Sequence, residues 1–341
     1  MTCNVSLKIR LSFLGWLILV TCICPSVWGS DIRFSSGRSA LAIPFELDDN
    51  LIYVPVSING SKPLSFILDT GAFTIVDLSR ALELGVKLNH KGQTGGIGEQ
   101  QQDVFLGAEN VSFGLPGVTL SNQRLLAVPL KKVEECVDVF VVDENGRDTA
   151  STQASLKGAR RKVDGILGAE FFYKFVVEID YASRLINVYE AGDYKYKGRG
   201  EKLGLEVTPQ HIFVKAQVFA QGRQALPVKL MVDTGGAMAI ALSRRFTDEH
   251  QLLPPMERLT ATPVCGIAGM MNEKSMLGEI DALQLGSLKI VSPLAEFRRA
   301  PLDYEFDGYL GGAVFRRYKV IFDYSRRLMI MEPAGSKVDR K

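Results

Sequence analysis

The chain contains one pattern twice, and this internal repeat limits the folds it can adopt more than any other feature. An apolar segment runs into Asp-Thr-Gly at residues 69–71 and again at residues 233–235. Further along, residues 164–188 and 307–331 share ten identities when they are aligned without gaps. One such triplet is common by chance, but two triplets with matched flanking sequence indicate two copies of one structural unit. The sequence therefore predicts two similar lobes.

A third correspondence lies between these anchors. The glycine-rich stretch at residues 95–98 aligns with residues 265–269, and each is followed by an apolar segment with Leu-Gly. Each half thus has the order strand, Asp-Thr-Gly, glycine-rich hairpin. The first half also carries an insertion at about residues 131–162, whose later part is polar and predicts an exposed loop.

Strand patterns dominate both halves, which predicts a mainly β protein with short helices. Alternating apolar segments separated by tight-turn residues indicate a β-meander at the start of each half. Short helices are expected at residues 78–84, 169–174, 244–250 and 313–317. We expect the first lobe to span residues 38–195 and the second to span residues 200–335, with the boundary in a cluster of glycine, lysine and arginine.

The N-terminus has the features of a signal peptide over residues 1–29. Lys8 and Arg10 precede an apolar run of signal-core length, and small residues follow it. The mature protein is therefore expected to be exported, either periplasmic or secreted; the alternative is an uncleaved N-terminal membrane anchor. Cleavage leaves only Cys136 and Cys265, and the sequence does not decide whether these two cysteines pair.

Composition argues against several other functions. The net charge of +2 provides no basic surplus for binding nucleic acid. No Cys-x-x-Cys or His-x-x-x-His pair is present, so we expect no metal and no cofactor. The histidines His90, His211 and His250 are scattered, which favours surface or core positions over catalytic ones.

The two aspartates carry the chemistry that this repeat predicts. Each stands at the tip of a loop that follows an apolar strand, and a pseudo-twofold axis would bring the two tips together. Two adjacent carboxyl groups cannot both ionise easily, so they share a proton. One can then activate water as a general base while the other donates to a carbonyl oxygen. Such a pair can hydrolyse amides without a metal or a covalent intermediate.

On these motifs the chain resembles the aspartic proteases. It is similar to retropepsin-like enzymes in its Asp-Thr-Gly-Ala at residues 69–72 and its Gly-Gly-Ile-Gly hairpin at residues 95–98, and to pepsin-like enzymes in having both lobes in one chain. The resemblance implies an acid-protease fold and an aspartic-type endopeptidase, a hydrolase that acts on peptides or proteins as a monomer. It implies a catalytic pair, Asp69 and Asp233; supporting residues, Thr70, Gly71, Thr234 and Gly235; and flap residues that contact substrate, Gly96, Ile97, Gly98, Gly266, Ile267 and Ala268.

The chain departs from the pepsin-like pattern just after each triplet. Ala72 and Gly236 replace the serine or threonine whose hydroxyl can hydrogen-bond the carboxylate. Fewer donors leave the pair less acid-shifted, so we predict an activity maximum in mildly acidic solution. Two alternatives remain open at this point: a peptide-binding module on the same fold that does not cut, and lobes that each pair with another chain.

Overall fold

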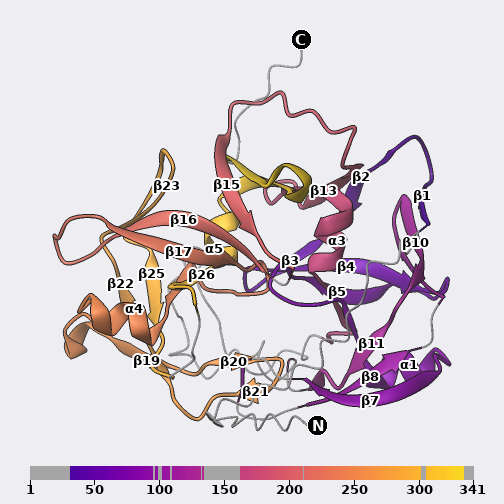
Figure 1. Cartoon of the computed structure of the whole chain (residues 1–341), viewed down its shortest axis with the longest axis horizontal. Helices are drawn as coiled ribbons and strands as arrows, with labels where there is room; N and C mark the ends of the chain where they lie inside the picture. Colours follow the sequence, from indigo (N-terminus) through magenta and orange to yellow (C-terminus); the bar gives the residue numbers. More distant parts are fainter. Residues whose placement is uncertain are drawn as a thin grey trace, which may run out of the picture.

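Short β-strands build most of the molecule. The computed structural model describes residues 31–94, 97–98, 102–107, 110–131, 133, 162–209, 211–300 and 305–333. The predicted signal peptide and nearly all of the predicted insertion lie outside the described residues. Within them, the prediction of a mainly β, two-lobed fold with few short helices is confirmed (Figure 1).

The elements of the first half follow the predicted meander. Its strands are β1 (Ile32–Phe34), β2 (Ser39–Pro44), β3 (Glu46–Asp48), β4 (Leu51–Ile58), β5 (Leu64–Leu68), β6 (Ile75–Asp77), β7 (Leu88–Thr94), β8 (Gln102–Gly107), β9 (Val111–Leu115), β10 (Val118–Gln123), β11 (Leu126–Val128), β12 (Gly165–Leu167), β13 (Phe175–Asp180) and β14 (Leu185–Glu190). Its helices are α1 (Leu78–Glu83) and α3 (Ala169–Lys174).

The second half repeats this arrangement. Its strands are β15 (Glu201–Val207), β16 (Ile212–Phe219), β17 (Leu226–Val232), β18 (Ile240–Leu242), β19 (Thr260–Thr262), β20 (Cys265–Gly266), β21 (Gly269–Met270), β22 (Ser275–Glu279), β23 (Ala282–Leu285), β24 (Leu288–Val291), β25 (Leu294–Phe297), β26 (Gly308–Leu310), β27 (Tyr318–Asp323) and β28 (Leu328–Pro333). Its helices are α4 (Arg244–Glu249) and α5 (Gly312–Phe315), with short 3₁₀ turns η2 (Met256–Arg258) and η3 (Tyr324–Arg326).

Each half contains the same crossed pairing of strands, and this pairing positions the aspartates. In the first half, β5 runs parallel to β12, and β12 runs antiparallel to β6. In the second half, β17 is parallel to β26, and β26 is antiparallel to β18. Each repeated downstream segment begins with a Leu-Gly block, at residues 167–168 and 310–311. The residue before each aspartate pairs with the leucine of this block, Leu68 with Leu167 and Val232 with Leu310. The repeat seen in the sequence is therefore a repeat of strand register.

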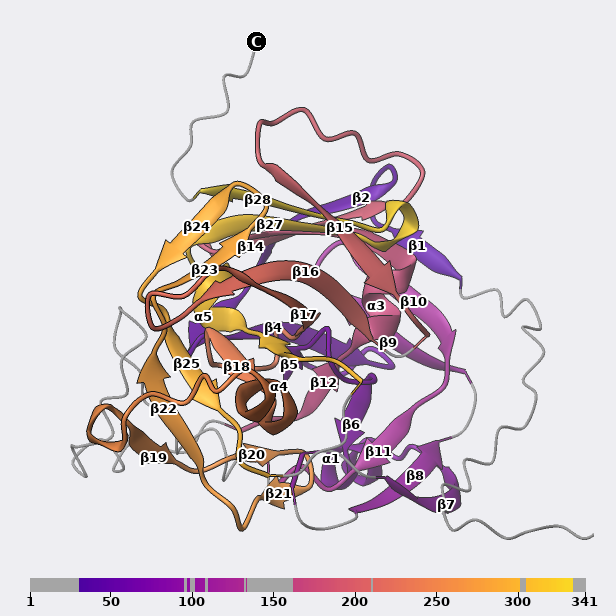
Figure 2. The ribbon, with the colours of Figure 1, turned by 60° about the vertical axis from the view of Figure 1, so that its left-hand side comes forward.

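A six-stranded segment joins the halves. Its order is β15-β28-β27-β13-β14-β2, so three strands of the second half are followed by three strands of the first half in one continuous sheet (Figure 2). At the junction β13 pairs antiparallel with β27, with Glu178 opposite Ile321. Glu178 is also in an ion pair with Lys319 at 3.0 Å across the same junction. Because this sheet crosses from one half to the other, the predicted lobe boundary at residues 195–200 stays a prediction.

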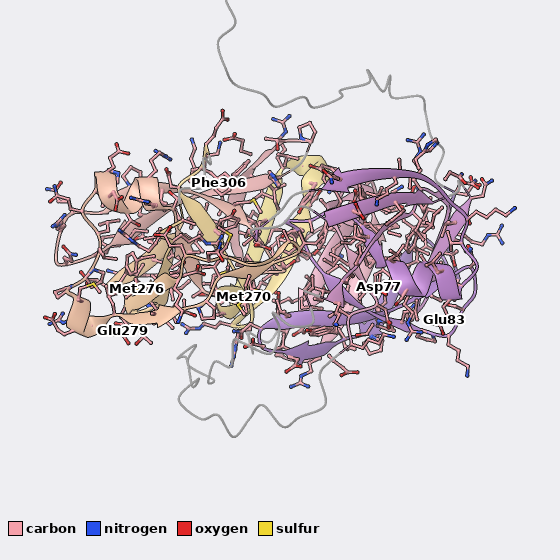
Figure 3. All side chains as sticks on the ribbon, turned by 90° about the horizontal axis from the view of Figure 1, so that it is seen from below. Asp77, Glu83, Met270, Met276, Glu279 and Phe306 are labelled. Atoms are coloured by element: carbon pink, nitrogen blue, oxygen red, sulfur yellow. The ribbon has the colours of Figure 1, made fainter. Side chains whose placement is uncertain are left out.

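Aromatic side chains fill the space beneath this shared sheet. Phe172 lies edge-on to Phe322, with ring centroids 5.4 Å apart, and stacks on Tyr324 at 5.7 Å. Phe172 and Phe322 are fully buried. Figure 3 shows the two halves side by side from below, with the side chains packed between their strands. These ring contacts join α3 of the first half to β27 and η3 of the second half beneath the shared sheet.

The described helices lie close to their predicted positions, whereas one strand lies where the sequence predicts none. Helix α3 covers the predicted residues 169–174, and the other three helices begin and end within two residues of their predicted bounds. Strand β1, by contrast, lies before the predicted start of the first lobe and pairs with β10, with Ile32 opposite Leu120. A three-residue strand has no periodic pattern of its own, and its conformation depends on the partner edge.

Candidate active site

The two aspartates stand where two buried strands end. Leu68 and Val232, the last residues of β5 and β17, are fully buried. The N–H of Asp69 donates to the carbonyl of Leu167 at 3.0 Å, and the N–H of Asp233 donates to the carbonyl of Leu310 at 2.9 Å. Each aspartate is therefore fixed from behind by a neighbouring parallel strand, and its side chain is left at the loop tip.

The two threonines interlock the loops. The hydroxyl of Thr70 donates to the carbonyl of Val232 at 2.8 Å, and the hydroxyl of Thr234 donates to the carbonyl of Leu68 at 2.8 Å. Each hydroxyl also accepts a hydrogen bond from the other threonine's backbone N–H at 3.0 Å. Both threonines are buried. This reciprocal set holds one loop against the other across the boundary between the halves.

The interlock brings the carboxyl groups together. Asp69 accepts a hydrogen bond from the N–H of Gly71 at 2.7 Å, and Asp233 accepts one from the N–H of Gly235 at 3.0 Å. The two carboxyl groups also hydrogen-bond each other. A Cβ at Gly235 would lie 2.3 Å from Cγ of Asp69, a contact that no side chain can make. Glycine is required there because the opposite aspartate occupies that space.

Burial and mutual repulsion set the protonation of this pair. Burial and the nearby charge of Asp233 hold the pKa of Asp69 well above its usual range. Burial also raises the pKa of Asp233, but the hydrogen bond from Asp69 and the cations Arg298 and His211 act in the opposite direction. The pair therefore retains one proton in acidic solution, and Asp69 is the member that favours holding it.

The Leu-Gly blocks lie directly against the aspartate loops. A Cβ at Gly168 would lie 2.3 Å from the backbone carbon of Phe73, and one at Gly311 would lie 2.2 Å from the carbonyl oxygen of Met238. In the first half the hydroxyl of Thr74 also accepts a hydrogen bond from the N–H of Gly168 at 3.0 Å. These close approaches support both loops.

Two hairpins meet tip to tip. The first is formed by β7 and β8, and the second by β20 and β21. The N–H of Ala268 donates to the carbonyl of Ile97 at 3.0 Å, and Gly266 lies so close that a Cβ would be 2.6 Å from the same oxygen. Gly96 lies outside the described residues. The structure thus brings together Ile97, Gly98, Gly266 and Ala268, four of the predicted flap residues.

The isoleucine of each tip packs against an apolar cluster. Ile97, from the first half, contacts a cluster built entirely from the second half. Ile267, from the second half, contacts a cluster built mainly from the first. The first of these clusters contains Phe213, Met231, Ala241, Phe306 and Tyr309. The second contains Leu51, Tyr53, Ile67, Ile75, Val128, Leu130, Val133, Val163 and Ile166.

The close contact of the tips predicts a strong effect of one substitution. Gly98 has φ +134°, and a Cβ there would lie 2.3 Å from the backbone of Ala268. We expect Gly98→Ala to keep the tips apart and to lower the free energy of unfolding by about 1–3 kcal/mol, the usual cost of such backbone strain. The matched control is Gly92→Ala on β7, whose Cβ would make an ordinary 3.5 Å contact with Val104. Equal free energies of unfolding in urea for the two variants would contradict a close contact between the tips.

Sequence comparison finds a likeness in the first half. Residues 54–171 match the family model described as aspartyl protease. The matched segment covers about a third of the chain. It includes Asp69 and the Leu-Gly block at residues 167–168 and ends within α3. No curated protein matches the chain in sequence. Among solved structures, basic 7S globulin from soybean is similar with a TM-score of 0.46 and 10% identity, over 88% of this chain and 96% of the globulin.

The structure adds residues around the two aspartates that the sequence did not single out. His211 is half-buried near Asp233; burial lowers its pKa, and the charge of Asp233 raises it. Arg298 is buried, with its guanidinium 4.6 Å from the ring centre of Tyr309. A strand-by-strand alignment of the repeat would have found Arg298, since its first-half counterpart is apolar.

Other expectations concern the surroundings of the site. Cys265 is disulfide-bonded, and the other four cysteines lie outside the described residues. Asp180 caps a turn through the N–H groups of Ala182 and Ser183. In the part of the chain that the structure describes, no three potential ligands gather to hold a metal, and no helix is long and apolar enough to cross a membrane.

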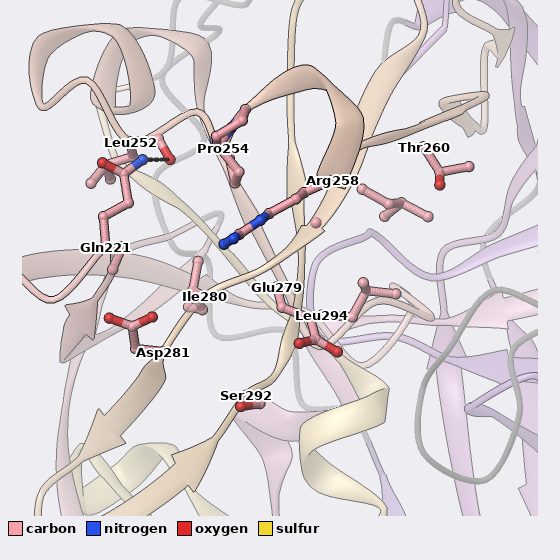
Figure 4. Close-up of a pocket in the computed structure, with 14 residues that line it drawn as sticks. Gln221, Leu252, Pro254, Arg258, Thr260, Glu279, Ile280, Asp281, Ser292 and Leu294 are labelled. Atoms are coloured by element: carbon pink, nitrogen blue, oxygen red, sulfur yellow. Dashed lines mark hydrogen bonds between the residues drawn. The ribbon is translucent and has the colours of Figure 1, made fainter.

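A separate cavity of about 610 Å³ lies on the second half, and neither aspartate lines it (Figure 4). Arg258 lines this cavity together with the acidic residues Glu279 and Asp281, and Pro254 and Pro255 belong to its wall. Because its lining includes neither aspartate, it is a different site from the paired carboxyl groups.

Proposed function

We propose that this chain is an aspartic endopeptidase that hydrolyses peptide bonds with a water molecule activated by Asp69 and Asp233. The observation that carries the proposal is the hydrogen-bonded pair of buried carboxyl groups, one from each Asp-Thr-Gly loop. Its protonation suits general acid–base work, because one group retains a proton while the other can ionise.

In the proposed reaction Asp233 removes a proton from water while Asp69 donates its proton to the carbonyl oxygen of the scissile bond. Water oxygen bonds to the carbonyl carbon and forms a tetrahedral intermediate. Transfer of a proton to the amide nitrogen then breaks the C–N bond and leaves a carboxyl and an amine. The N–H groups of Gly71 and Gly235 hold the carboxylates in place throughout. The tips at Ile97 and Ala268 would cover the substrate and keep bulk water out.

The partly exposed tip residues Ile97 and Ile267 support extended peptide substrates with an apolar side chain beside the scissile bond. We extend the proposal to a monomeric enzyme, because one chain supplies both loops and both tips, and to an exported one, from the N-terminal sequence pattern.

Cleavage of a mixed peptide library between pH 3 and 8 tests the proposal. Residues 31–341 are incubated with the library, and the new termini are identified by mass spectrometry. The double variant Asp69→Asn/Asp233→Asn controls for contaminating protease. We expect cleavage by the wild type alone, with a maximum in mildly acidic solution, because Ala72 and Gly236 supply no side-chain donor to lower the pKa of either carboxyl. A folded wild type that binds peptides without cutting them would instead establish a recognition module.

A further inference from the structure

The strands around each aspartate form one wall of the site, and the repeat matches the residues of the two walls position by position. Met231 and Ile67 each lie two residues before an aspartate; Met231 pairs with Phe213, and Ile67 pairs with Tyr53. On the other side of the aspartate strands, Tyr309 pairs with Ala241 just as Ile166 pairs with Ile75. At these positions both walls are apolar or aromatic.

One strand further out, the two walls differ in charge. Phe297 pairs with Leu242, and its counterpart Ala127 pairs with Val76. The neighbouring residues therefore correspond as well. In the first half these neighbours are Leu126 and Val128, whereas in the second half they are Glu296 and Arg298. A charged pair thus replaces an apolar pair on one side of the site.

This charged pair is deeply buried. The side chains of Arg298 and Glu296 are 4% and 7% exposed, and their Nε and Oε1 atoms lie 3.3 Å apart. The guanidinium also lies over the ring of Tyr309, which belongs to the cluster beneath Ile97. Taking two charges out of water is costly, and a buried ion pair is rarely more stable than the apolar residues that could replace it. Its presence on one side therefore suggests a role other than stability.

The cation acts on one aspartate more than on the other. Arg298 favours the ionised form of Asp233, whereas it is not among the main influences on the pKa of Asp69. The other titratable groups that face Asp233 are Asp69 and His211, and burial holds the pKa of His211 down so that it contributes little charge above mild acidity. Arg298, although paired with Glu296, is thus a permanent positive charge that acts on the second aspartate.

We propose that Arg298 is a positioning residue that gives the two aspartates fixed roles, with the shared proton on Asp69 and the negative charge on Asp233. This inference rests on the proposed function. A symmetric pair would place the proton on either carboxyl with equal probability. The Arg298 charge removes this ambiguity before substrate binds, so that Asp233 is always the base and Asp69 always the acid.

The test copies the first-half residues into the second half. The double variant Glu296→Leu/Arg298→Val removes both charges and leaves no buried ion unpaired, while Arg298→Lys keeps the cation. We expect the acid limb of the pH profile of kcat/KM to move up by about one pH unit in the double variant, because an opposite charge nearby lowers a carboxyl pKa by about 1–3 units. Arg298→Lys should keep the wild-type acid limb. A merely structural role would lower kcat/KM at every pH without moving the limb.

A second measurement does not need activity. Carboxyl carbons of ¹³C-labelled aspartate are followed by NMR from pH 2 to 8, with Asp69→Asn and Asp233→Asn used for assignment. The lower of the two apparent pKa values of the pair should rise in the double variant, or in Arg298→Gln if the double variant does not fold. An unchanged titration overturns the role of Arg298. A wild type that titrates as expected but cuts no peptide overturns the proposed function and leaves the assignment of the proton intact.

Discussion

Replacing Asp69 by asparagine should abolish peptide cleavage and make the folded chain more stable at neutral pH. Removal of one general acid–base group lowers the rate by about 10²–10⁴-fold. The stability gain follows from the difference between the pKa of Asp69 in the folded state and its pKa in the unfolded state. The folded pKa of Asp69 is raised by burial and by Asp233, so folding favours its protonated form. That stabilisation is complete below the unfolded pKa of about 3.9 and is lost as the pH rises through the folded pKa. Asparagine cannot ionise, so the loss does not occur.

Thermal unfolding at pH 4 and pH 7 measures the expected gain in stability of Asp69→Asn. The Tm difference between Asp69→Asn and wild type should be larger at pH 7 than at pH 4. Asp164→Asn is the matched control, because this buried carboxylate accepts hydrogen bonds from the N–H of Ser65 at 2.9 Å and from Arg80 at 2.6 Å. Loss of these charge-assisted bonds should lower Tm at both pH values. A destabilised Asp69→Asn at pH 7 would show that the buried pair is not under electrostatic strain.

The second large effect is expected at the interlocked threonines. In Thr70→Val the carbonyl of Val232 and the N–H of Thr234 lose a hydrogen-bond partner in a buried site. Each unsatisfied buried group costs about 1–3 kcal/mol, so the free energy of unfolding should fall by about 2–6 kcal/mol. Thr70→Ser keeps the hydroxyl and should stay within about 1 kcal/mol of wild type.

Urea unfolding at neutral pH provides these values, and peptide cleavage by the same variants provides the functional effect. Activity of Thr70→Val should fall even where the chain is fully folded, because the two aspartates are no longer held in register. If the valine variant unfolds like the serine variant, the interlock does not hold the loops together.

The parts of the site that could be predicted are those that repeat in the sequence. The meeting of Asp69 with Asp233 could be predicted because each follows a buried strand and precedes the same downstream block. The two hairpins could be predicted because glycine-rich stretches stand at matched places, although the sequence did not predict the contact of Ile97 with Ala268. In both cases a local pattern occurs twice, and a pseudo-twofold axis converts two local patterns into one site.

The features that were missed depend on long-range pairing. Strand β1 is too short to have a pattern, and the junction of β13 with β27 leaves no local trace in either strand, since both read as ordinary buried strands. Arg298 was missed for a different reason. The sequence motifs that mark the repeat do not extend to this strand, and the difference between Val128 and Arg298 becomes visible only when strand register connects them.

The shared sheet across β13 and β27 has a consequence for how such a site can diversify. An assembly of two identical chains must carry every substitution twice, so a charge placed beside one aspartate appears beside the other and cancels any bias between them. Here the strands of both halves are paired within one polypeptide, and each half carries its own set of residues. Joining the halves covalently breaks the symmetry and frees each aspartate to specialise while the backbone that holds the pair stays nearly twofold.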